Sequence, residues 1–190
     1  MAHQRIAFVG GLRTGKDTAA NFLVASFGFR RISISETVKA TVNAAFQAAG
    51  FDTTNKGFMR APLQDGGLAG RGVDPELWVG SVIRRYRLED EHQGSGFACS
   101  DVRYRNEAEL LRKCGFLIVR IAASRETQEA RAQIDDGTFD PSVFEHPSET
   151  EMTQIVHDVL IENDTPEDRE RMFATLTALV TDPSYADADD

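Results

Sequence analysis

Gly10-Gly-Leu-Arg-Thr-Gly-Lys-Asp-Thr18 is the stretch that decides the fold of this chain. It follows a short apolar run, Ile6-Ala-Phe-Val9, that is typical of a buried parallel strand. It leads into a segment whose apolar residues have helical spacing. The stretch fits the pattern G-x-x-x-x-G-K, in which glycines let the backbone curl so that several N–H groups point at phosphate oxygens. Because the pattern stands between a strand and a helix, we predict a phosphate-binding loop.

The residues of this loop indicate how a nucleotide triphosphate would be held. The N-terminus of the following helix adds roughly half a positive charge, and Lys16 can reach the β- and γ-phosphates. The residue after this lysine is usually a Ser or Thr that binds Mg²⁺, whereas here it is Asp17, which could hold the metal directly or through water. Thr18 stands where many such loops touch the α-phosphate. The predicted phosphate-binding residues are Gly10, Gly11, Arg13, Thr14, Gly15, Lys16, Asp17 and Thr18.

Strand and helix patterns alternate along the rest of the chain. Apolar runs predict strands at 6–9, 97–100, 116–122 and 159–161, and the alternation of isoleucines with polar residues predicts another at 31–35. Helical spacing and capping residues predict helices at 15–27, 35–49, 74–86, 106–114, 125–135 and from 165, with shorter ones near 57–68 and from 148. Ser35 is the predicted cap of the helix at 35–49. Polar or glycine-rich loops are predicted at 88–96 and 137–147. This order predicts βαβ units, and therefore an α/β fold with a five-stranded parallel sheet flanked by helices.

A second carboxylate, Asp101, ends the third predicted strand. In an open parallel sheet, ligands bind beyond the carboxyl ends of the strands, so Asp101 is a candidate metal anchor or acceptor-positioning group. A cap for the following helix is the plain alternative. Arg103 and Arg105 come next, and a planar guanidinium suits contact with a phosphate, although we expect at least one of the two to point outward.

Composition narrows the range of partners. The net charge of −9 argues against a long nucleic acid, because proteins that grip one usually carry a basic face. No run of about 18 apolar residues exists, so we expect no membrane span. The N-terminus lacks the layout of a signal peptide, and two cysteines, Cys99 and Cys114, suit a reduced compartment. We therefore expect a cytoplasmic protein.

With these residues in hand, the chain resembles the phage-type deoxynucleoside monophosphate kinases, a branch of the nucleoside monophosphate kinase-like P-loop proteins. The phosphate loop is one of four segments that carry the resemblance, and its Lys-Asp-Thr variant is itself typical of the group. The other three are Asp74-Pro-Glu-Leu-Trp-Val79, Asp101-Val-Arg-Tyr-Arg-Asn-Glu-Ala108, and His146-Pro-Ser-Glu149 followed by Val159-Leu-Ile-Glu-Asn-Asp164. They occur in the family's order and cover most of the chain. Tyr104-Arg105 departs from the family, which often has Phe-Pro there.

The resemblance implies a three-layer P-loop kinase fold in a single domain over 1–181, followed by an acidic tail at 182–190. Within the domain it implies an acceptor-binding insertion at about 50–95 and a lid at about 123–150. The implied reaction moves the γ-phosphoryl group of ATP, bound with Mg²⁺, to a deoxynucleoside monophosphate and yields a diphosphate and ADP. A chain of this kind encoded by a phage would act in the host cytoplasm.

The resemblance also implies roles for individual residues. Those implied in catalysis are Lys16, Asp101, Arg103 and Arg131. Those implied in acceptor binding are Lys39, Arg60, Gln64, Trp78, Arg103 and Glu107. Asn163 joins the ATP site, and Asp17 and Asp101 are expected to hold Mg²⁺ through water.

Two other functions stay open at this point. One is another small-molecule P-loop kinase, resembling dephospho-coenzyme A kinase or phosphomevalonate kinase. The other is a nucleotide-dependent switch or binding module without turnover, although the chain lacks the N-K-x-D motif expected of a GTPase. The bases accepted, the preference for deoxyribose and the oligomeric state, a homodimer included, are not determined by the sequence.

Overall fold

The computed structural model describes residues 5–93, 96–136 and 151–182. The chain divides into two compact units. We call Met1–Ile32 together with Gly94–Asp190 the core unit, and Ser33–Gln93 the inserted unit. The predicted loop at 137–147 and the first residues of the helix predicted from 148 lie outside the described residues.

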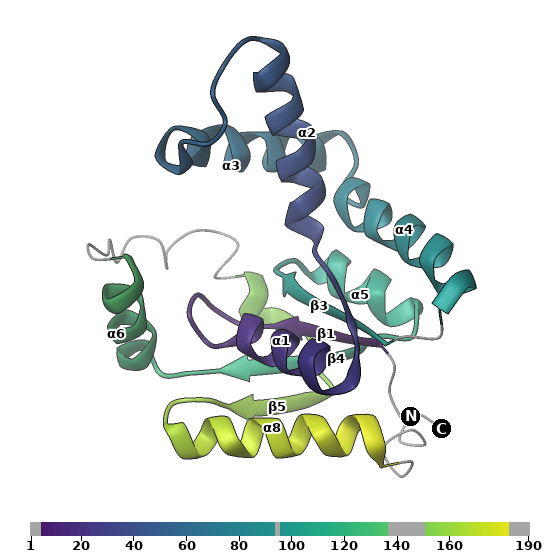
Figure 1. Ribbon diagram of the computed structural model, residues 1–190, viewed down its shortest axis with the longest axis vertical. Coiled ribbons are helices and arrows are strands. Elements are labelled where there is room, and N and C mark those ends of the chain that lie inside the picture. The colour runs from purple at the N-terminus through teal and green to yellow at the C-terminus, as the bar shows by residue number, and fades with distance from the viewer. Residues whose placement is uncertain (1–4, 94–95, 137–150, 183–190) are drawn as a thin grey trace. The chain divides into compact units, whose positions relative to one another are not determined.

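The core unit is built on a five-stranded parallel sheet, as the sequence predicts (Figure 1). Its strands are β1 (Arg5–Val9), β2 (Arg30–Ile32), β3 (Phe97–Val102), β4 (Leu117–Ala122) and β5 (Val159–Glu162), in the order β2-β3-β1-β4-β5. The central strand β1 is almost wholly apolar and fully buried from Ile6 to Val9, which is the pattern of a strand covered on both faces. The predicted α/β class is therefore confirmed.

Among the described residues, the core unit has four α-helices: α1 (Lys16–Phe27), α5 (Arg105–Lys113), α6 (Arg125–Asp136) and α8 (Pro166–Thr181). A short 3₁₀ helix, η2, covers Met152–Gln154. The helices α1 and α8 pack on the same face of the sheet, where their side chains form one hydrophobic core with strand residues. Its largest members include Ile6, Phe8, Leu23, Ile121, Met172, Leu176 and Leu179. The packing of α1 on the sheet places the N-terminus of this helix near the carboxyl ends of the strands.

Three helices form the inserted unit: α2 (Ile34–Ala48), α3 (Lys56–Val73) and α4 (Leu77–Gln93). Trp78 of this unit is buried, with 6% of its surface exposed, and donates from Nε1 to the Gly67 carbonyl at 2.9 Å. The indole lies directly on α3, since a Cβ added at Gly70 would come within 2.2 Å of the ring. Glycines on α3 therefore make room for the one tryptophan of the chain.

Several predicted boundaries in and around this unit were wrong. The predicted short helix at 57–68 is the longer α3, which begins where Asn55 Oδ1 accepts from Phe58 N at 3.1 Å. The helix α4 continues to Gln93, well into the predicted loop at 88–96, where residues 88–93 contain no glycine or proline. Ser33, and not Ser35, caps α2, since its Oγ accepts from Glu36 N at 3.2 Å. The strand predicted at 31–35 accordingly ends at Ile32.

The N-terminus of α8 is held by a reciprocal capping box. Thr165 Oγ1 accepts from Asp168 N at 3.1 Å, and Asp168 Oδ2 accepts from Thr165 N at 2.9 Å, with Pro166 at the first helical position. The Asp168 carboxylate accepts hydrogen bonds from the Thr165 backbone N–H, from the Arg171 side chain and from the Thr165 hydroxyl. Together these bonds lower the pKa of Asp168 from 3.8 to about 2. The capped helix start predicted at Thr165-Pro-Glu-Asp168 is confirmed.

This box predicts a pH dependence of stability. Because the pKa of Asp168 is depressed in the folded state, the box should stabilise the protein above the unfolded pKa and lose its effect as pH falls toward about 2. Asp168→Asn should therefore lower Tm at neutral pH, and the gap to wild type should narrow between about pH 4 and pH 2. Thermal unfolding followed by circular dichroism measures both. Glu167→Gln removes a charge from the same helical turn without touching the box and is the matched control. A gap that stays constant with pH would contradict this account.

Candidate phosphate-binding site

The loop between β1 and α1 has the tightly curled backbone that its glycines predict. Gly15 has φ 104° and Gly10 has φ 156°, while Arg13, at φ 58°, is the non-glycine residue with positive φ in the described ranges. Neither glycine leaves space for a side chain. A Cβ at Gly10 would lie 2.3 Å from the Ile121 carbonyl oxygen, and one at Gly15 would lie 2.3 Å from Asn163 Nδ2. Conformation and close packing therefore both require glycine here.

Two other segments of the core unit brace this loop. Asn163, in the turn between β5 and α8, donates from Nδ2 to the Thr14 carbonyl at 2.7 Å, and it is only 3% exposed. Arg131, on α6, donates to the Arg13 carbonyl at 3.1 Å and to the Asn163 carbonyl at 2.8 Å. The loop is further closed on itself by Thr14, whose hydroxyl donates to the Gly11 carbonyl at 3.1 Å. The backbone of the loop is therefore held by hydrogen bonds from α6 and from the turn between β5 and α8.

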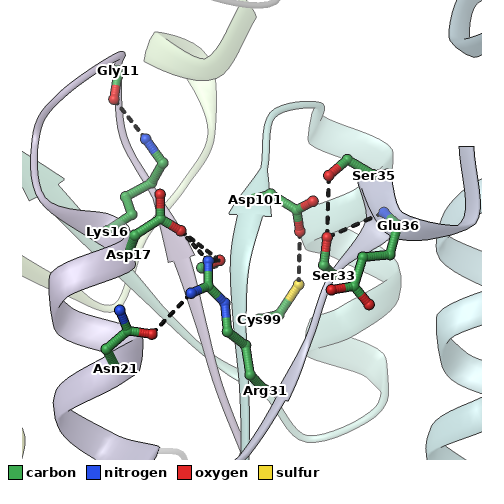
Figure 2. Close-up of polar contacts among 11 residues, drawn as sticks. Gly11, Lys16, Asp17, Asn21, Arg31, Ser33, Ser35, Glu36, Cys99 and Asp101 are labelled. Atoms are coloured by element: carbon green, nitrogen blue, oxygen red, sulfur yellow. Dashed lines mark hydrogen bonds and ion pairs between the residues drawn. The ribbon is translucent and has the colours of Figure 1, made fainter. Parts of the chain in front are cut away.

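Lys16, the first residue of α1, extends over the loop. Its Nζ donates to the carbonyls of Gly10, at 2.6 Å, and Gly11 (Figure 2). The ammonium group therefore lies where the curled backbone and the N-terminus of α1 meet. A positive side chain, a helix N-terminus and loop N–H groups in one place form a site for an anion such as phosphate.

Asp17 follows as the second residue of α1, and its contacts were not predicted. Its carboxylate Oδ1 forms an ion pair with Arg31 and accepts from Ser100 Oγ at 3.2 Å (Figure 2). Arg31, from the edge strand β2, also donates to Ser100 Oγ at 2.8 Å and to Asn21 Oδ1 at 2.9 Å. The described residues thus give the Asp17 carboxylate two partners, both at Oδ1.

The end of β3 carries Asp101, as expected, but with an irregularity that the sequence does not reveal. Paired positions run from Ala7 with Cys99 to Val9 with Val102, so β3 has an extra residue opposite β1. This bulge brings both Ser100 and Asp101 to the carboxyl end of the strand. Asp101 Oδ1 accepts from the Cys99 thiol at 3.6 Å, and burial raises the pKa of that thiol well above its usual range.

Asp17 and Asp101, the two carboxylates expected to share a metal, contact different residues in this structure. Asp17 contacts Arg31 and Ser100, whereas Asp101 contacts Cys99 (Figure 2). Within the described ranges, no group of three or more His, Cys, Asp or Glu side chains is placed to hold a metal ion. A metal held between Asp17 and Asp101 through water and nucleotide oxygens remains a prediction.

The segment after Asp101 forms the start of α5. Glu107 is 1% exposed, and its Oε2 accepts from the backbone N–H groups of Arg103, at 3.0 Å, and Tyr104, at 3.2 Å. This carboxylate therefore stabilises the helix N-terminus, and its predicted contact with the acceptor is untested. Arg103 is partly buried at the turn, whereas Arg105 is exposed and lies 3.6 Å from Glu109.

The other predicted acceptor residues belong to the inserted unit. Lys39 is exposed on α2 and Gln64 is exposed on α3, and Arg60 is also part of α3. Trp78 is different, because its indole is buried against α3 and hydrogen-bonded there. That contact gives Trp78 a structural role within the unit, and the acceptor roles of all four stay predictions.

Three residues at the site were not predicted from the sequence: Asn21, Arg31 and Ser100. Their positions in the sequence carry no motif, and they meet only after β2, β3 and α1 are assembled. One feature of the sequence could have predicted a cation here. A carboxylate at Asp17, beside a site for anionic phosphates, is stabilised by a positive side chain nearby.

Comparison with known proteins places this fold. No protein-family model matches the sequence, and no match was found among curated proteins. Solved structures do match over nearly their full length. An unliganded sugar kinase from Janibacter sp. HTCC2649 has a TM-score of 0.61 at 17% identity, covering 96% of this chain and 98% of that one. A gluconokinase from Sinorhizobium meliloti 1021 has a TM-score of 0.60 at 17% identity, covering 98% of each chain.

A dephospho-CoA kinase from Campylobacter jejuni also matches, with a TM-score of 0.53 at 12% identity, covering 94% of this chain and 98% of that one. The chain therefore has the α/β fold of the P-loop kinases, as the sequence predicts. At these identities the likeness concerns the fold. In the described part of the chain, no helix is long and apolar enough to cross a membrane.

The packing at Gly15 predicts a sharp effect of one methyl group. Gly15→Ala should weaken ATP binding at least about tenfold, because positive φ costs a non-glycine residue about 1–3 kcal/mol and the new Cβ displaces Asn163. Isothermal titration calorimetry with ATP and Mg²⁺ measures the change. Gly28→Ala is the matched control, since Gly28 also has positive φ, 70°, but has no atom within 4 Å of an added Cβ. Equal binding by the two variants would show that the contact with Asn163 is unimportant.

Proposed function

We propose that this chain is an ATP-dependent phosphotransferase whose acceptor is a deoxynucleoside monophosphate. The observation that carries the proposal is the loop from Gly10 to Thr18, with the Lys16 ammonium over its curled backbone and braces from Asn163 and Arg131. The kinase folds of the structural neighbours support the phosphotransferase class. The four sequence segments named above support the choice of acceptor.

Phosphoryl transfer depends mainly on positioning and charge neutralisation, and the loop provides for both. Its N–H groups and the N-terminus of α1 would bind the phosphates, and Lys16 would move from the loop carbonyls to the β- and γ-phosphate oxygens. Lys16 would then stabilise the negative charge on the transferred group. Arg131 would act indirectly, because it donates to the Arg13 carbonyl and so holds the phosphate-binding loop in position.

The residues present fit ATP with Mg²⁺. Asn163 Oδ1 is buried without a hydrogen-bond partner in the described residues, so it offers an acceptor beside the loop to a nucleotide. Asp17 is 74% exposed with both of its contacts at Oδ1, which leaves the other oxygen available to a water ligand of the metal. Asp101 is the second proposed metal partner. Mg²⁺, when bound, neutralises phosphate charge and usually keeps several of its waters.

The acceptor in this proposal needs no strong general base. A monophosphate oxygen is already anionic at neutral pH, so Asp101 would orient the metal and acceptor and would not remove a proton. Arg103 and Arg60 are the residues proposed to hold the acceptor phosphate, because a guanidinium can contact two of its oxygens. The lid and the remaining acceptor contacts follow from the resemblance alone.

A second candidate function is supported by the comparisons. The neighbours include a gluconokinase and a dephospho-CoA kinase, so another small-molecule acceptor is a real alternative to the monophosphate. A nucleotide-binding module without turnover is the third reading. Stoichiometric ADP formation that depends on an acceptor separates the kinases from such a module.

Lys16→Ala tests the proposed phosphate site. Loss of charge stabilisation at the γ-phosphate should reduce kcat/KM by on the order of 10³ or more. The fold should survive, because Lys16 is only partly buried and is not a member of the hydrophobic core. Coupled ADP assays give the rates and circular dichroism gives Tm. Lys113→Ala, on the core unit outside the loop, is the control. A Lys16 variant within about tenfold of wild type would rule out this role for the loop.

An acceptor panel tests the substrate. With ATP and Mg²⁺, deoxynucleoside monophosphates should give acceptor-dependent ADP release, whereas gluconate, dephospho-coenzyme A and phosphomevalonate should not. Product identity is checked by chromatography with mass spectrometry, which separates a deoxynucleoside diphosphate from the ADP formed beside it. A better rate with any of the three competitors would replace the monophosphate assignment and keep the kinase. No acceptor-dependent turnover with the whole panel would favour a binding module.

A further inference from the structure

The proposed mechanism gives no role to Arg31, a cation near the loop with three hydrogen-bond partners. Arg31 forms the ion pair with Asp17 and donates to Ser100 Oγ at 2.8 Å and to Asn21 Oδ1 at 2.9 Å. Asp17 and Asn21 are one turn apart on α1, and Ser100 is a buried residue of β3, two positions before the strand ends. A single guanidinium from the edge strand β2 thus ties the first turns of α1 to the central part of the sheet (Figure 2).

The charge of Asp17 creates the need for such a cation. A phosphate-binding loop usually has a hydroxyl at this position, and a carboxylate there repels the anionic triphosphate. An exposed ion pair is weakened by solvent. Here, however, Ser100 is hydrogen-bonded to both partners, so the geometry of the pair is fixed by a buried group. Arg31 is therefore placed to cancel the added negative charge where it would oppose binding.

Resting on the proposed binding of ATP at this loop, we propose that Arg31 is a positioning residue that neutralises Asp17 and so allows the nucleotide to enter without its metal. Mg²⁺ bound to ATP brings positive charge of its own to the phosphates. The contribution of Arg31 should therefore be large for metal-free ATP and small for the Mg²⁺ complex. A residue that merely supported the fold would affect both forms equally.

Calorimetric titration of the full chain with ATP, once in EDTA and once in excess Mg²⁺, tests the proposal. Arg31→Gln should raise the Kd of metal-free ATP about tenfold or more and that of the Mg²⁺ complex less than about threefold. In an Asp17→Asn background the same change should have less than about a threefold effect in either condition, because no carboxylate then needs a counter-charge. Arg30→Gln is the matched control, since it removes a neighbouring charge that lies over the Phe97 ring at 6.0 Å.

Every result decides the matter. Equal losses with and without metal, or equal losses in both backgrounds, would overturn the pairing role and leave the proposed function intact. If wild type binds ATP in neither condition, the proposed function fails and the inference fails with it. If Arg31→Gln does not fold by circular dichroism, Asp17→Asn carries the test alone. It leaves the guanidinium uncompensated and should tighten metal-free ATP, so unchanged or weaker binding would overturn the proposal.

Discussion

The contact between Gly15 and the buried amide of Asn163 is the constraint on which the site depends. It forces the end of the loop to be glycine, and the same amide holds the Thr14 carbonyl. Asn163 is itself fixed because β5 and α8 meet around it, and α8 is fixed by the core that it shares with α1. The phosphate-binding loop therefore depends on β5, α1 and α8. Its backbone conformation is held by Asn163, and the position of Asn163 is held by the packing of α8 on α1.

The electrostatics of the site differ from those of a loop with a hydroxyl after the lysine. Positive charge comes from Lys16, from the helix N-terminus and from Arg31, and negative charge comes from Asp17. Lys16 and Asp17 are consecutive residues of α1 with opposite charges, and they have different partners. Lys16 lies on the loop carbonyls and Asp17 lies on the sheet side, against Ser100 and Arg31. The substitution of a carboxylate for a hydroxyl is thus accompanied by a cation and a buried hydroxyl from other strands.

The sequence predicts the parts of this structure that depend on local pattern. The strands were predictable because runs such as Ile6–Val9 are apolar throughout, and the start of α8 was predictable because Thr165 and Asp168 form a local capping box. The extent of α3 was not, because five glycines and Pro62 disfavour a helix that only tertiary packing restores. The Arg31 contacts were not predictable either, since they join residues 14 and 69 positions apart. Ser33 caps α2 instead of the predicted Ser35, because only the backbone geometry decides between two serines that lie two positions apart.

The burial of Trp78 against the glycines of α3 has a spectroscopic consequence. It is the one tryptophan of the chain, and it belongs wholly to the inserted unit. Intrinsic fluorescence excited in the indole band therefore reports on the docking of α3 and is silent about the packing around the phosphate loop. Because a helix rich in glycine has little stability of its own, its docking can be lost before the sheet unfolds. Emission and far-ultraviolet dichroism would then follow two separate transitions of one protein.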